Sequence, residues 1–372
     1  MGVIRVLVVD DSVVVRRLVS EALSHAPGIE VVGVAANGRL ALAKVAQLRP
    51  DAVTMDIEMP EMNGIEAVRE LRATGYRMPI IMFSTLTERG AAATLDALAA
   101  GATDYVPKPS NAGSLQESMT RVADELVPRL RSLVPVPGAV AGVSRTRRLG
   151  APAAPGAPGP LVAPHRVPTT RPAPAPHASR LVVMGSSTGG PEALSRVLSA
   201  LTGPPSVPVL VVQHMPPVFT RQLAARLDRL GPATVSEAAG GELLEAGHVY
   251  VAPGDRHLQV RRSGTRLETV LTDDPPENYC RPAVDVLFRS AVRAVGGDLV
   301  AVVLTGMGSD GRTGCTDVVE AGGTVIVQDE PTSVVWGMPG AVAGAGLAHQ
   351  VVPITQVAPA VERALQAGGA RA

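Results

Sequence analysis

The chain has few cysteines and few aromatic side chains, and each shortage excludes a class of protein. Among its 372 residues only Cys280 and Cys315 are cysteines, which excludes the disulfide framework of a small secreted domain. Aromatic residues make up 2% of the chain, which argues against binding nucleic acid by stacking bases on rings. The hydrophobic fraction is nevertheless 46%, so we expect cores of aliphatic side chains.

The sequence also has little that suits a membrane. No secretory signal begins at Met1. The stretch 331–361 contains no Asp, Glu, Lys or Arg, but Pro339, Pro353 and Pro359 divide it into pieces too short to cross a bilayer. We therefore expect a cytoplasmic protein without membrane insertion.

Charge is balanced overall but unevenly distributed. The 34 acidic and 34 basic residues cancel, which argues against a generally basic nucleic-acid-binding protein. Residues 1–133 carry a net charge of −2, residues 134–180 carry +6 and residues 181–372 carry −4. The composition therefore predicts two domains joined by a segment of a different kind, as the length also favours.

Residues 1–133 alternate between strand and helix patterns. Apolar segments with the length of buried strands are separated by helical segments. The expected strands are 3–9, 29–34, 52–55, 79–83 and 103–106. The expected helices begin near Ser12 and lie near 38–48, 63–74, 87–100 and 112–127. This alternation predicts an open, doubly wound parallel sheet of five strands.

Residues 134–180 are rich in Pro, Ala and Gly and poor in large apolar residues. We interpret them as an extended, semi-rigid linker with partial polyproline II character. The six arginines of this linker either keep it solvated or contact an acidic surface.

Residues 181–372 return to the α/β alternation. The segments 180–184, 208–213 and 299–304 are fully apolar, as expected of strands buried in a parallel sheet. Three short segments between them predict a hairpin insertion, at 248–252, 258–262 and 267–271. Later strands are expected at 324–328 and 350–353. The prediction is a second doubly wound α/β domain with a β-hairpin insertion.

Polar side chains follow several of the strands in the first domain. Asp10 and Asp11 follow the first strand and Asp56 follows the third; Ser84 and Lys108 follow the fourth and fifth. Because the carboxyl ends of parallel strands line one crevice, these side chains can converge. Grouped carboxylates suit Mg²⁺, and a carboxylate beside an ammonium and a hydroxyl can accept a phosphoryl group. The alternative is that the carboxylates are separate helix caps.

Lys108 supports a site, because the chain has only one other lysine, Lys44, against 32 arginines. A lysine beside carboxylates in such a chain indicates that a compact charge is needed there. With the segments 55–60 and 105–109, these residues resemble the receiver domain of two-component response regulators over about residues 1–125.

The resemblance implies a flavodoxin-like fold and a role for each of these residues. A histidine kinase would phosphorylate Asp56, Lys108 would pair with the phosphoryl group, and Ser84 would act as the switch hydroxyl. The residues implied as ligands or supports of Mg²⁺ are Asp10, Asp11, Asp56 and, through its backbone carbonyl, Glu58.

A serine in the second domain has the spacing of a nucleophile elbow. Gly185, Ser187 and Gly189 follow an apolar strand, and Pro191 lies in the first turn of the helix after it. The flanking glycines allow a tight turn that exposes the hydroxyl, and the helix N-terminus offers N–H groups to an oxyanion. A phosphate loop is disfavoured because its Gly-Lys-Ser/Thr ending is missing. A purely structural turn is the other alternative.

Partners for this serine follow two other strands. His214 follows the strand at 208–213, and Asp310 follows the strand at 299–304. All three side chains are therefore expected at the carboxyl ends of parallel strands. In such a triad Ser187 attacks an acyl carbon, His214 takes its proton, and Asp310 steadies the imidazolium.

The oxyanion formed by that attack also needs donors. We expect the Thr188 N–H and a group near Met307 to hold it. The order Ser, His, Asp along the chain differs from the order Ser, Asp, His of α/β-hydrolases, so that family is disfavoured.

The second domain resembles the catalytic domain of chemotaxis protein-glutamate methylesterases, the CheB family. The matching stretches are 185–194, 213–220, 250–254, 281–288 and 304–311. A receiver joined to this domain is the architecture of that family, so the resemblance covers nearly the whole chain apart from the linker. Ser186 departs from the usual Ala, and we interpret it as filling a slot for a small residue. The linker is also unusually long and proline-rich.

The resemblance implies a phosphorylation-activated serine esterase that gives sensory adaptation. It would hydrolyse glutamyl methyl esters on chemoreceptors, releasing methanol, and would deamidate receptor glutamines, with no cofactor at the esterase site. A chemotaxis histidine kinase would be the phosphodonor, and the receiver would cover the serine site until Asp56 is phosphorylated.

Two other functions are weighed against this one. The first is a non-enzymatic response regulator that acts through protein binding and has a degenerate serine site. The second, a DNA-binding output, is disfavoured because residues 181–372 are acidic, contain almost no aromatics and show no helix-turn-helix of the expected size.

Overall fold

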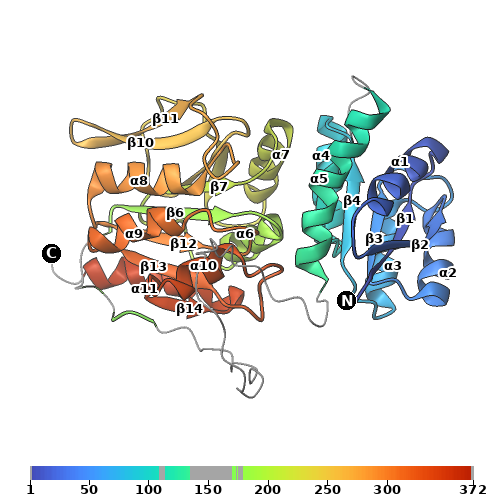
Figure 1. The fold of residues 1–372 in the computed structure, drawn as a ribbon. Helices are drawn as coiled ribbons and strands as arrows, with labels where there is room; N and C mark the ends of the chain where they lie inside the picture. Colours follow the sequence, from blue (N-terminus) through green and yellow to red (C-terminus); the bar gives the residue numbers. More distant parts are fainter. Residues whose placement is uncertain (1, 109–113, 135–169, 173, 175–178, 370–372) are drawn as a thin grey trace, which may run out of the picture.

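The computed structural model describes residues 2–108, 114–134, 170–172, 174 and 179–369, which form two α/β units side by side (Figure 1). Most of the predicted linker, residues 134–180, lies outside the described residues. Within its described part, the backbone N–H of Arg171 donates to the Ala348 carbonyl at 2.8 Å, so this point of the chain is attached to the second unit.

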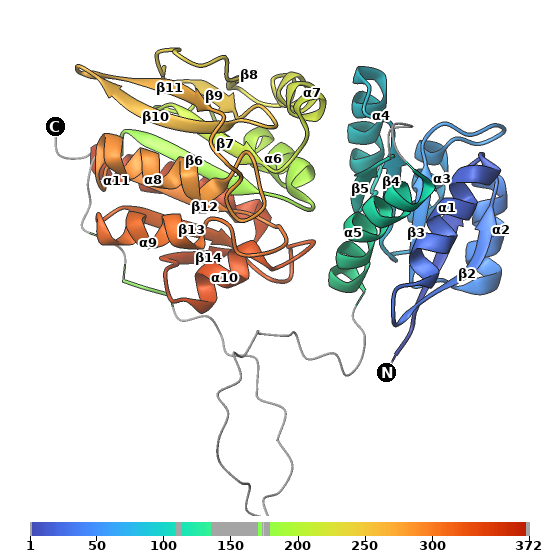
Figure 2. The same cartoon turned by 45° about the horizontal axis from the view of Figure 1, so that its top comes forward.

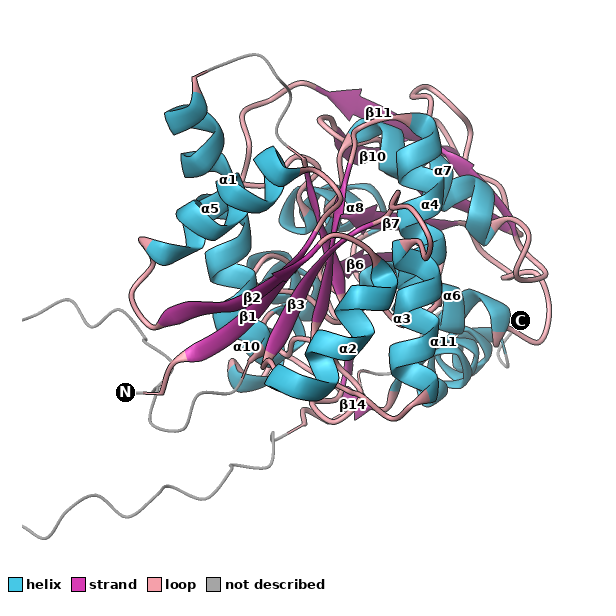
Figure 3. Ribbon diagram, turned by 90° about the vertical axis from the view of Figure 1, so that its right-hand side faces the viewer, coloured by secondary structure: helices cyan, strands magenta, loops and turns pink. Residues whose placement is uncertain are grey.

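The first unit is a parallel five-stranded sheet between two layers of helices (Figure 3). The strand order is β2-β1-β3-β4-β5, with bounds Ile4–Val9 (β1), Ile29–Ala35 (β2), Ala52–Asp56 (β3), Ile80–Ser84 (β4) and Asp104–Pro107 (β5). Helices α1 and α5 cover one face and α2, α3 and α4 cover the other. Their bounds are Val13–Ser24 (α1), Gly38–Leu48 (α2), Gly64–Ala73 (α3), Glu88–Ala99 (α4) and Leu115–Leu133 (α5). The predicted sheet is confirmed.

The second unit contains a seven-stranded sheet in which every pairing is parallel. The order is β14-β13-β12-β6-β7-β9-β8. The strands are Leu181–Ser186 (β6), Val209–Gln213 (β7), Thr234–Glu237 (β8), His248–Val251 (β9), Leu299–Val303 (β12), Thr324–Gln328 (β13) and Gln350–Val352 (β14). The predicted doubly wound α/β fold is confirmed here as well.

Helices again cover both faces of this sheet. Helices α6, α7 and α11 pack on one face, and α8, α9 and α10 pack on the other. Their bounds are Gly190–Ser199 (α6), Pro217–Leu227 (α7), Val284–Val295 (α8), Arg312–Glu320 (α9), Met338–Gly344 (α10) and Ile354–Gly369 (α11). The antiparallel hairpin of β10 (His257–Ser263) and β11 (Arg266–Thr272) packs over α8, as predicted for an insertion (Figure 2).

Two details of the strand prediction differ from the structure. The segment 248–252 was expected in the hairpin, but β9 lies in the main sheet between β7 and β8. Strand β8 was not predicted. It is a four-residue edge strand whose sequence, Thr-Val-Ser-Glu, has one buried residue. Both strands are short, and the sheet that a short strand joins is decided by distant pairing rather than by its own pattern.

The position of β6 determines where a site can form. Strand β7 pairs with one edge of β6 and β12 pairs with the other, so the chain reverses its direction of winding at β6. In an open α/β sheet, such a switch point opens a crevice beyond the carboxyl ends of the strands.

No helix among the described residues is both long enough and apolar enough to cross a membrane.

The two units contact each other through helices. Helix α4 of the first unit packs against α7 and α6 of the second (Figure 1). Buried apolar side chains of both units join in one cluster, in which Leu98 and Tyr105 of the first unit accompany Phe219 and Leu223 of the second. The first unit therefore lies over the helices that follow β6 and β7.

Candidate functional site

The loops after three neighbouring strands bring Ser187, His214 and Asp310 to one end of the second sheet. Ser187 directly follows β6, His214 follows β7, and Asp310 lies in the loop after β12. Gly306 packs directly against the serine, because a Cβ atom on it would lie 2.8 Å from the Cβ of Ser187. The loop after β12 therefore needs a glycine at this position to approach the serine so closely.

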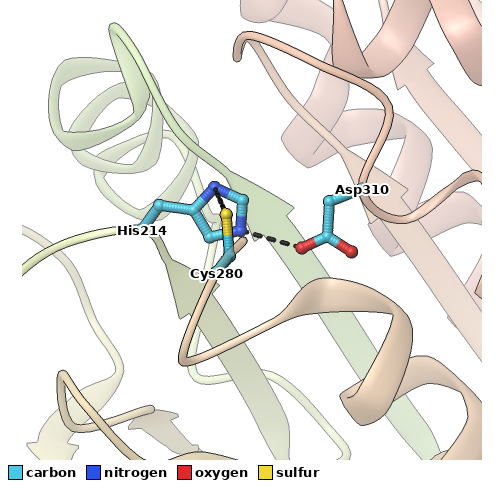
Figure 4. A group of neighbouring side chains, drawn as sticks. All are labelled: His214, Cys280 and Asp310. Carbon is cyan, nitrogen blue, oxygen red and sulfur yellow. Dashed lines mark hydrogen bonds and ion pairs between the residues drawn. The ribbon is translucent and has the colours of Figure 1, made fainter. Parts of the chain in front are cut away.

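His214 and Asp310 are joined by a hydrogen bond. Nε2 of His214 lies 2.8 Å from Oδ2 of Asp310, and both side chains are largely buried (Figure 4). The start of α8 holds the carboxylate, since the Val284 N–H donates to Oδ2 at 2.7 Å and the Asp285 N–H donates to Oδ1 at 3.0 Å. The Gly311 N–H adds a third bond at 2.9 Å. A buried carboxylate is thus satisfied by the backbone of a helix N-terminus.

These contacts change the protonation of the pair. Burial alone would lower the pKa of His214, but the hydrogen bonds with Asp310 and Cys280 outweigh burial and raise the pKa to about 10. Burial alone would raise the pKa of Asp310, but His214 and the backbone donors hold that pKa below its usual value. The pair is therefore an imidazolium beside a carboxylate at neutral pH.

Ser187 lies beside this pair without being bonded to it. Ser187 and His214 both line one cavity of about 30 Å³, and no hydrogen bond joins their side chains among the residues the structure describes. The backbone N–H of Ser187 donates to the Thr305 carbonyl at 3.0 Å, which fixes the turn. The structure thus brings the three predicted residues together but leaves the contact between serine and histidine unmade.

The second nitrogen of the histidine ring faces a residue that the sequence did not indicate. Nδ1 of His214 lies 3.6 Å from Sγ of Cys280, while the other ring nitrogen is bonded to Asp310 (Figure 4). Ligand atoms of the three side chains all lie within 4.8 Å of one another. Nothing in the sequence indicated Cys280, because it lies in the loop between β11 and α8 and does not directly follow a strand.

Ser186 does more than fill a small slot. Its buried hydroxyl donates to Oε1 of Gln213 at 2.7 Å. The amide nitrogen of Gln213 then donates to the Ser187 carbonyl at 2.9 Å. Ser186 therefore orients an amide that ties the end of β7 to the serine turn, and the earlier interpretation of Ser186 is incomplete.

Thr188 and Met307, the expected oxyanion supports, lie on the two loops that flank Ser187. Thr188 is buried, and its hydroxyl donates to Oδ2 of Asp104, a residue of the first unit, at 2.9 Å. Met307 is half-buried next to Gly306. The first unit thus contacts the residue that directly follows the serine.

Asp104 belongs to a group of first-unit side chains that face the serine site. Arg129 donates to Oδ2 of Asp104 at 3.2 Å, and burial raises the pKa of Asp104 although Arg129 opposes this. The ring of Tyr105 stacks on Phe219 with centroids 4.6 Å apart. Asp104, Tyr105 and Arg129 also line the 30 Å³ cavity with Ser187. That volume has room for only one or two water molecules, so an ester side chain does not fit.

The predicted acidic pocket forms at the end of the first sheet. Ligand oxygens of Asp10, Asp11 and Asp56 lie within 4.8 Å of one another. Nζ of Lys108 lies 2.9 Å from Asp10 and 2.8 Å from Asp56. Burial raises the pKa of Asp56 to about 6, with Asp10 adding to the rise and Lys108 opposing it. The all-oxygen donor set fits Mg²⁺.

The side chains of Ser84 and Glu58, also predicted near this pocket, contact residues outside it. The Ser84 hydroxyl accepts a hydrogen bond from Thr94 at 2.6 Å and donates to the Gly90 carbonyl at 3.2 Å, so it is bonded to α4. The side chain of Glu58 is exposed and lies 3.4 Å from Arg89.

Comparison with known proteins agrees with both units. The family model described as CheB methylesterase matches residues 182–361, and the model described as response regulator receiver domain matches residues 6–120. A protein-glutamate methylesterase/protein-glutamine glutaminase of Nocardioides sp. is 61% identical over 97% of this chain and 95% of its own length. The chain belongs to the protein-glutamate methylesterase/protein-glutamine glutaminase family.

Two further relatives are also named as methylesterases. A protein of Trichodesmium erythraeum is 44% identical over 96% of this chain and 98% of its own length. The solved catalytic domain of Thermotoga maritima CheB methylesterase is 41% identical, with 50% of this chain and 98% of that domain covered, and has a TM-score of 0.49. The family resemblance predicted from the sequence is confirmed, and the comparisons give no support to the non-enzymatic alternative.

The contact between His214 and Asp310 makes a prediction about protonation in this methylesterase. Replacing Asp310 with Asn removes the charge that stabilises the imidazolium, so we expect Asp310→Asn to lower the pKa of His214 from about 10 by about 1 to 3 pH units. The measurement is an NMR titration of the protein with ¹³C-labelled histidine. Asp273→Asn, at an exposed carboxylate paired with Arg256, is the control and should leave the titration unchanged.

The same interaction has a consequence for stability. Since the pKa of His214 is raised on folding, its contribution to the free energy of unfolding is fully present below pH about 6.5 and is lost as the pH rises towards 10. A His214 titration that is identical in the wild type and in Asp310→Asn would contradict the assignment.

Proposed function

We propose that this chain is a phosphorylation-controlled esterase that removes methyl groups from glutamyl methyl esters of chemoreceptors. It releases methanol, and it deamidates receptor glutamines at the same site. The observation that carries the proposal is the buried hydrogen bond between His214 and Asp310 beside Ser187, at the switch point of the sheet. The methylesterase names of the relatives support the choice of substrate.

The bonded nitrogen of His214 indicates how the base works. Since Nε2 is bonded to Asp310, Nδ1 is the nitrogen that accepts the proton of the Ser187 hydroxyl. The serine oxygen attacks the acyl carbon, and Nδ1 returns the proton to the leaving group. Methanol leaves from an ester and ammonia leaves from an amide, so both reactions pass through one acyl-enzyme that water then hydrolyses. Only neutral His214 accepts a proton, so activity rises with pH.

Side chains and backbone donors supply the rest of the esterase chemistry. We place the developing oxyanion at the Thr188 N–H, before the N-terminus of α6, with help from the loop at Met307. Nucleophile, base and acid are then all present in Ser187, His214 and Asp310, so the proposed reaction requires no cofactor at this site.

The acidic pocket is proposed to receive the phosphoryl group. Mg²⁺ would be held by Asp10, Asp11, Asp56 and the Glu58 carbonyl, and it would offset negative charge around the phosphoryl oxygens when bound. Asp56 supplies the carboxylate oxygen that a histidine kinase phosphorylates. Lys108, already bonded to Asp56, pairs with the added charge.

The position of Ser84 explains how phosphorylation would reach the esterase site. Its hydroxyl is bonded to Gly90 and Thr94 of α4, and it must leave these partners to bind a phosphoryl group on Asp56. Helix α4 packs against α7, where Asp96 is paired with Arg226 at 2.8 Å. A change at Ser84 thereby reaches the interface between the two units, which encloses the 30 Å³ cavity at Ser187. Conformations in which this interface is separated, the open form, then become more populated.

Domain boundaries form part of the proposal. The receiver would occupy residues 1–133, the linker residues 134–180 and the methylesterase domain residues 181–372. The end of α5 at Leu133 and the start of β6 at Leu181 support these limits.

The esterase proposal is tested by methanol release from a methylated chemoreceptor cytoplasmic domain. Ser187→Ala removes the attacking oxygen, so we expect the rate to fall by about 10⁴-fold or more. Ser195→Ala, which changes a part-buried helix serine bonded to the Pro191 carbonyl, is the control and should keep the rate near that of the wild type. Unchanged methanol release in Ser187→Ala would overturn the proposal.

Control by phosphorylation is tested with acetyl phosphate and Mg²⁺. These should raise methanol release by the wild type, because phosphorylated Asp56 shifts the population towards the open form. Asp56→Asn provides no oxygen for an acyl phosphate and should show no rise. A rise that persists in Asp56→Asn would reject the switch.

The ion pair between Asp96 and Arg226 allows a charge-exchange test of the closed interface. An exposed pair contributes about 0.2 to 1 kcal/mol, so Asp96→Arg and Arg226→Asp should each raise the unphosphorylated rate by about 1.4- to 5-fold. The double variant restores opposite charges and should return the rate to the wild-type value. Arg17→Glu, in a receiver pair with Glu21 within α1, should have no effect. Double-variant rates above both single variants would contradict the interface.

A further inference from the structure

Cys280 contacts the proposed base but has no part in the proposed reaction. Its Sγ lies 3.6 Å from Nδ1 of His214. Because Asp310 occupies Nε2, Nδ1 is the nitrogen that Ser187 must use. The thiol therefore stands at the position on the ring where its chemical state matters most to the esterase.

A closely bonded turn holds the thiol in this position. The Glu277 N–H donates to the Cys280 carbonyl at 3.0 Å, and the Cys280 N–H donates to the Glu277 carbonyl at 2.9 Å. The two residues between them, Asn278 and Tyr279, have φ angles of 53° and 63°. Positive φ at two successive non-glycine residues is strained, and it persists only where surrounding contacts enforce it.

Those contacts come from the same elements that hold the triad. The Asn278 amide donates to Asp310 at 3.2 Å and to Asp285 at 3.0 Å. Arg289 of α8 donates to both carboxylate oxygens of Glu277. The turn, the start of α8 and Asp310 thus form one framework, so the contact of the thiol with His214 is a built feature of the site.

Reagents can reach this thiol in the closed arrangement. Cys280 is half-buried and lines a cavity of about 450 Å³ together with His214 and, from the receiver, Tyr105 and Arg129. Cys315, in α9, is fully buried, and burial raises the pKa of its thiol well above the usual value. One of the two cysteines is thus accessible beside an imidazole, and the other is protected.

We propose that Cys280 is an oxidisable thiol through which hydroperoxides reversibly switch off the esterase site. The effect on activity rests on the function proposed above. The reactivity of the thiol rests only on the geometry of Cys280, His214 and Asp310, and on the cavity that reaches them.

In this oxidation, His214 supplies the proton that the departing peroxide oxygen takes. The thiolate is the nucleophilic form of a cysteine, and a positively charged imidazolium beside the sulfur favours it, so the thiol proton passes to solvent. The sulfur attacks one peroxide oxygen, so an S–O bond forms and the O–O bond breaks. Sulfur loses two electrons and the peroxide gains them. The departing oxygen takes the proton from His214, which regains one from solvent, so that a thiol and hydrogen peroxide yield a sulfenic acid and water.

The product blocks the base that Ser187 needs. The sulfenic oxygen lies next to Nδ1 of His214 and forms a hydrogen bond with it, which removes that nitrogen from the serine. Two equivalents of a small thiol reverse the change, giving a disulfide of the small thiol, water and the original cysteine. The buried Cys315 cannot act as a resolving thiol, so the sulfenic acid persists until external thiol reduces it.

The first experiment follows the modification itself in the full-length protein. The protein is treated with hydrogen peroxide in the presence of dimedone, which captures sulfenic acids, and is analysed by intact mass and peptide mapping. We expect one adduct, at Cys280, in the wild type and in the matched control Cys315→Ala, and no adduct in Cys280→Ser. A folded wild type that shows no adduct at Cys280 would overturn the proposal.

The second experiment tests the part played by the histidine. In His214→Gln no imidazolium stabilises the thiolate or supplies a proton to the departing oxygen, so the rate of adduct formation at Cys280 should fall by about 10-fold or more. An equal rate in His214→Gln and the wild type would show that the contact with the ring does not activate the thiol. This readout needs no esterase activity, so it decides the reactivity of Cys280 even if the proposed function fails.

The third experiment measures methanol release before and after peroxide, with each variant compared with its own untreated rate. The wild type and Cys315→Ala should lose activity by about 10-fold and regain it with dithiothreitol. Cys280→Ser should keep its untreated rate. Oxidation of methionine is not reversed by dithiothreitol, so recovery separates the two kinds of damage.

The possible results are distinguishable. An adduct at Cys280 without loss of methanol release would overturn the switch, and a loss that persists in Cys280→Ser would assign inhibition to another group. If the untreated wild type releases no methanol, the proposed function fails, and the adduct rates alone decide whether Cys280 is the reactive thiol.

Discussion

The hydrogen bond between Asp310 and His214 is the interaction on which the rest of the site depends. Asp310 is buried, and a buried carboxylate stays ionised only if donors surround it; here the first N–H groups of α8 and the His214 ring do so. This bond occupies Nε2, while Nδ1, the nitrogen that we propose accepts the proton of Ser187, lies beside Cys280. The proposed proton path and the contact of the ring with a thiol both follow from it.

The interface between the two units depends on a few neighbouring residues of one strand, β5. Asp104 and Tyr105 are successive residues of β5; the first accepts a hydrogen bond from Thr188, beside the serine, and the second stacks on Phe219 of α7. Lys108 directly follows β5 and is bonded to Asp56. One short strand and the residue after it therefore run from the acidic pocket to the esterase site, which gives a local change at Asp56 a physical route to the serine.

Much of the fold and the candidate site was predictable from local patterns. Buried parallel strands are continuous apolar runs, and polar residues directly after them are expected at one edge, which is why Asp10, Asp56, Ser187 and His214 stand out. The structure brings Asp10 and Asp56 together at one site and Ser187 and His214 at another, while their functional roles stay predictions. Cys280 and Asp104 carry no such signal, because Cys280 lies in the loop before α8 and Asp104 begins β5, so neither residue directly follows a strand. Strands β8 and β9 were misjudged because short strands are assigned by distant partners.

By itself, the sequence determined the two α/β units, the strand ends that carry chemistry and the family, since these depend on local periodicity and on motifs of adjacent residues. Only the tertiary structure decided which ring nitrogen of His214 meets Asp310, that Ser186 orients Gln213, and that receiver side chains line the cavity of about 30 Å³ at Ser187. Those features depend on side-chain orientation and on contacts between distant segments, which are fixed when the chain packs and leave no pattern in neighbouring residues.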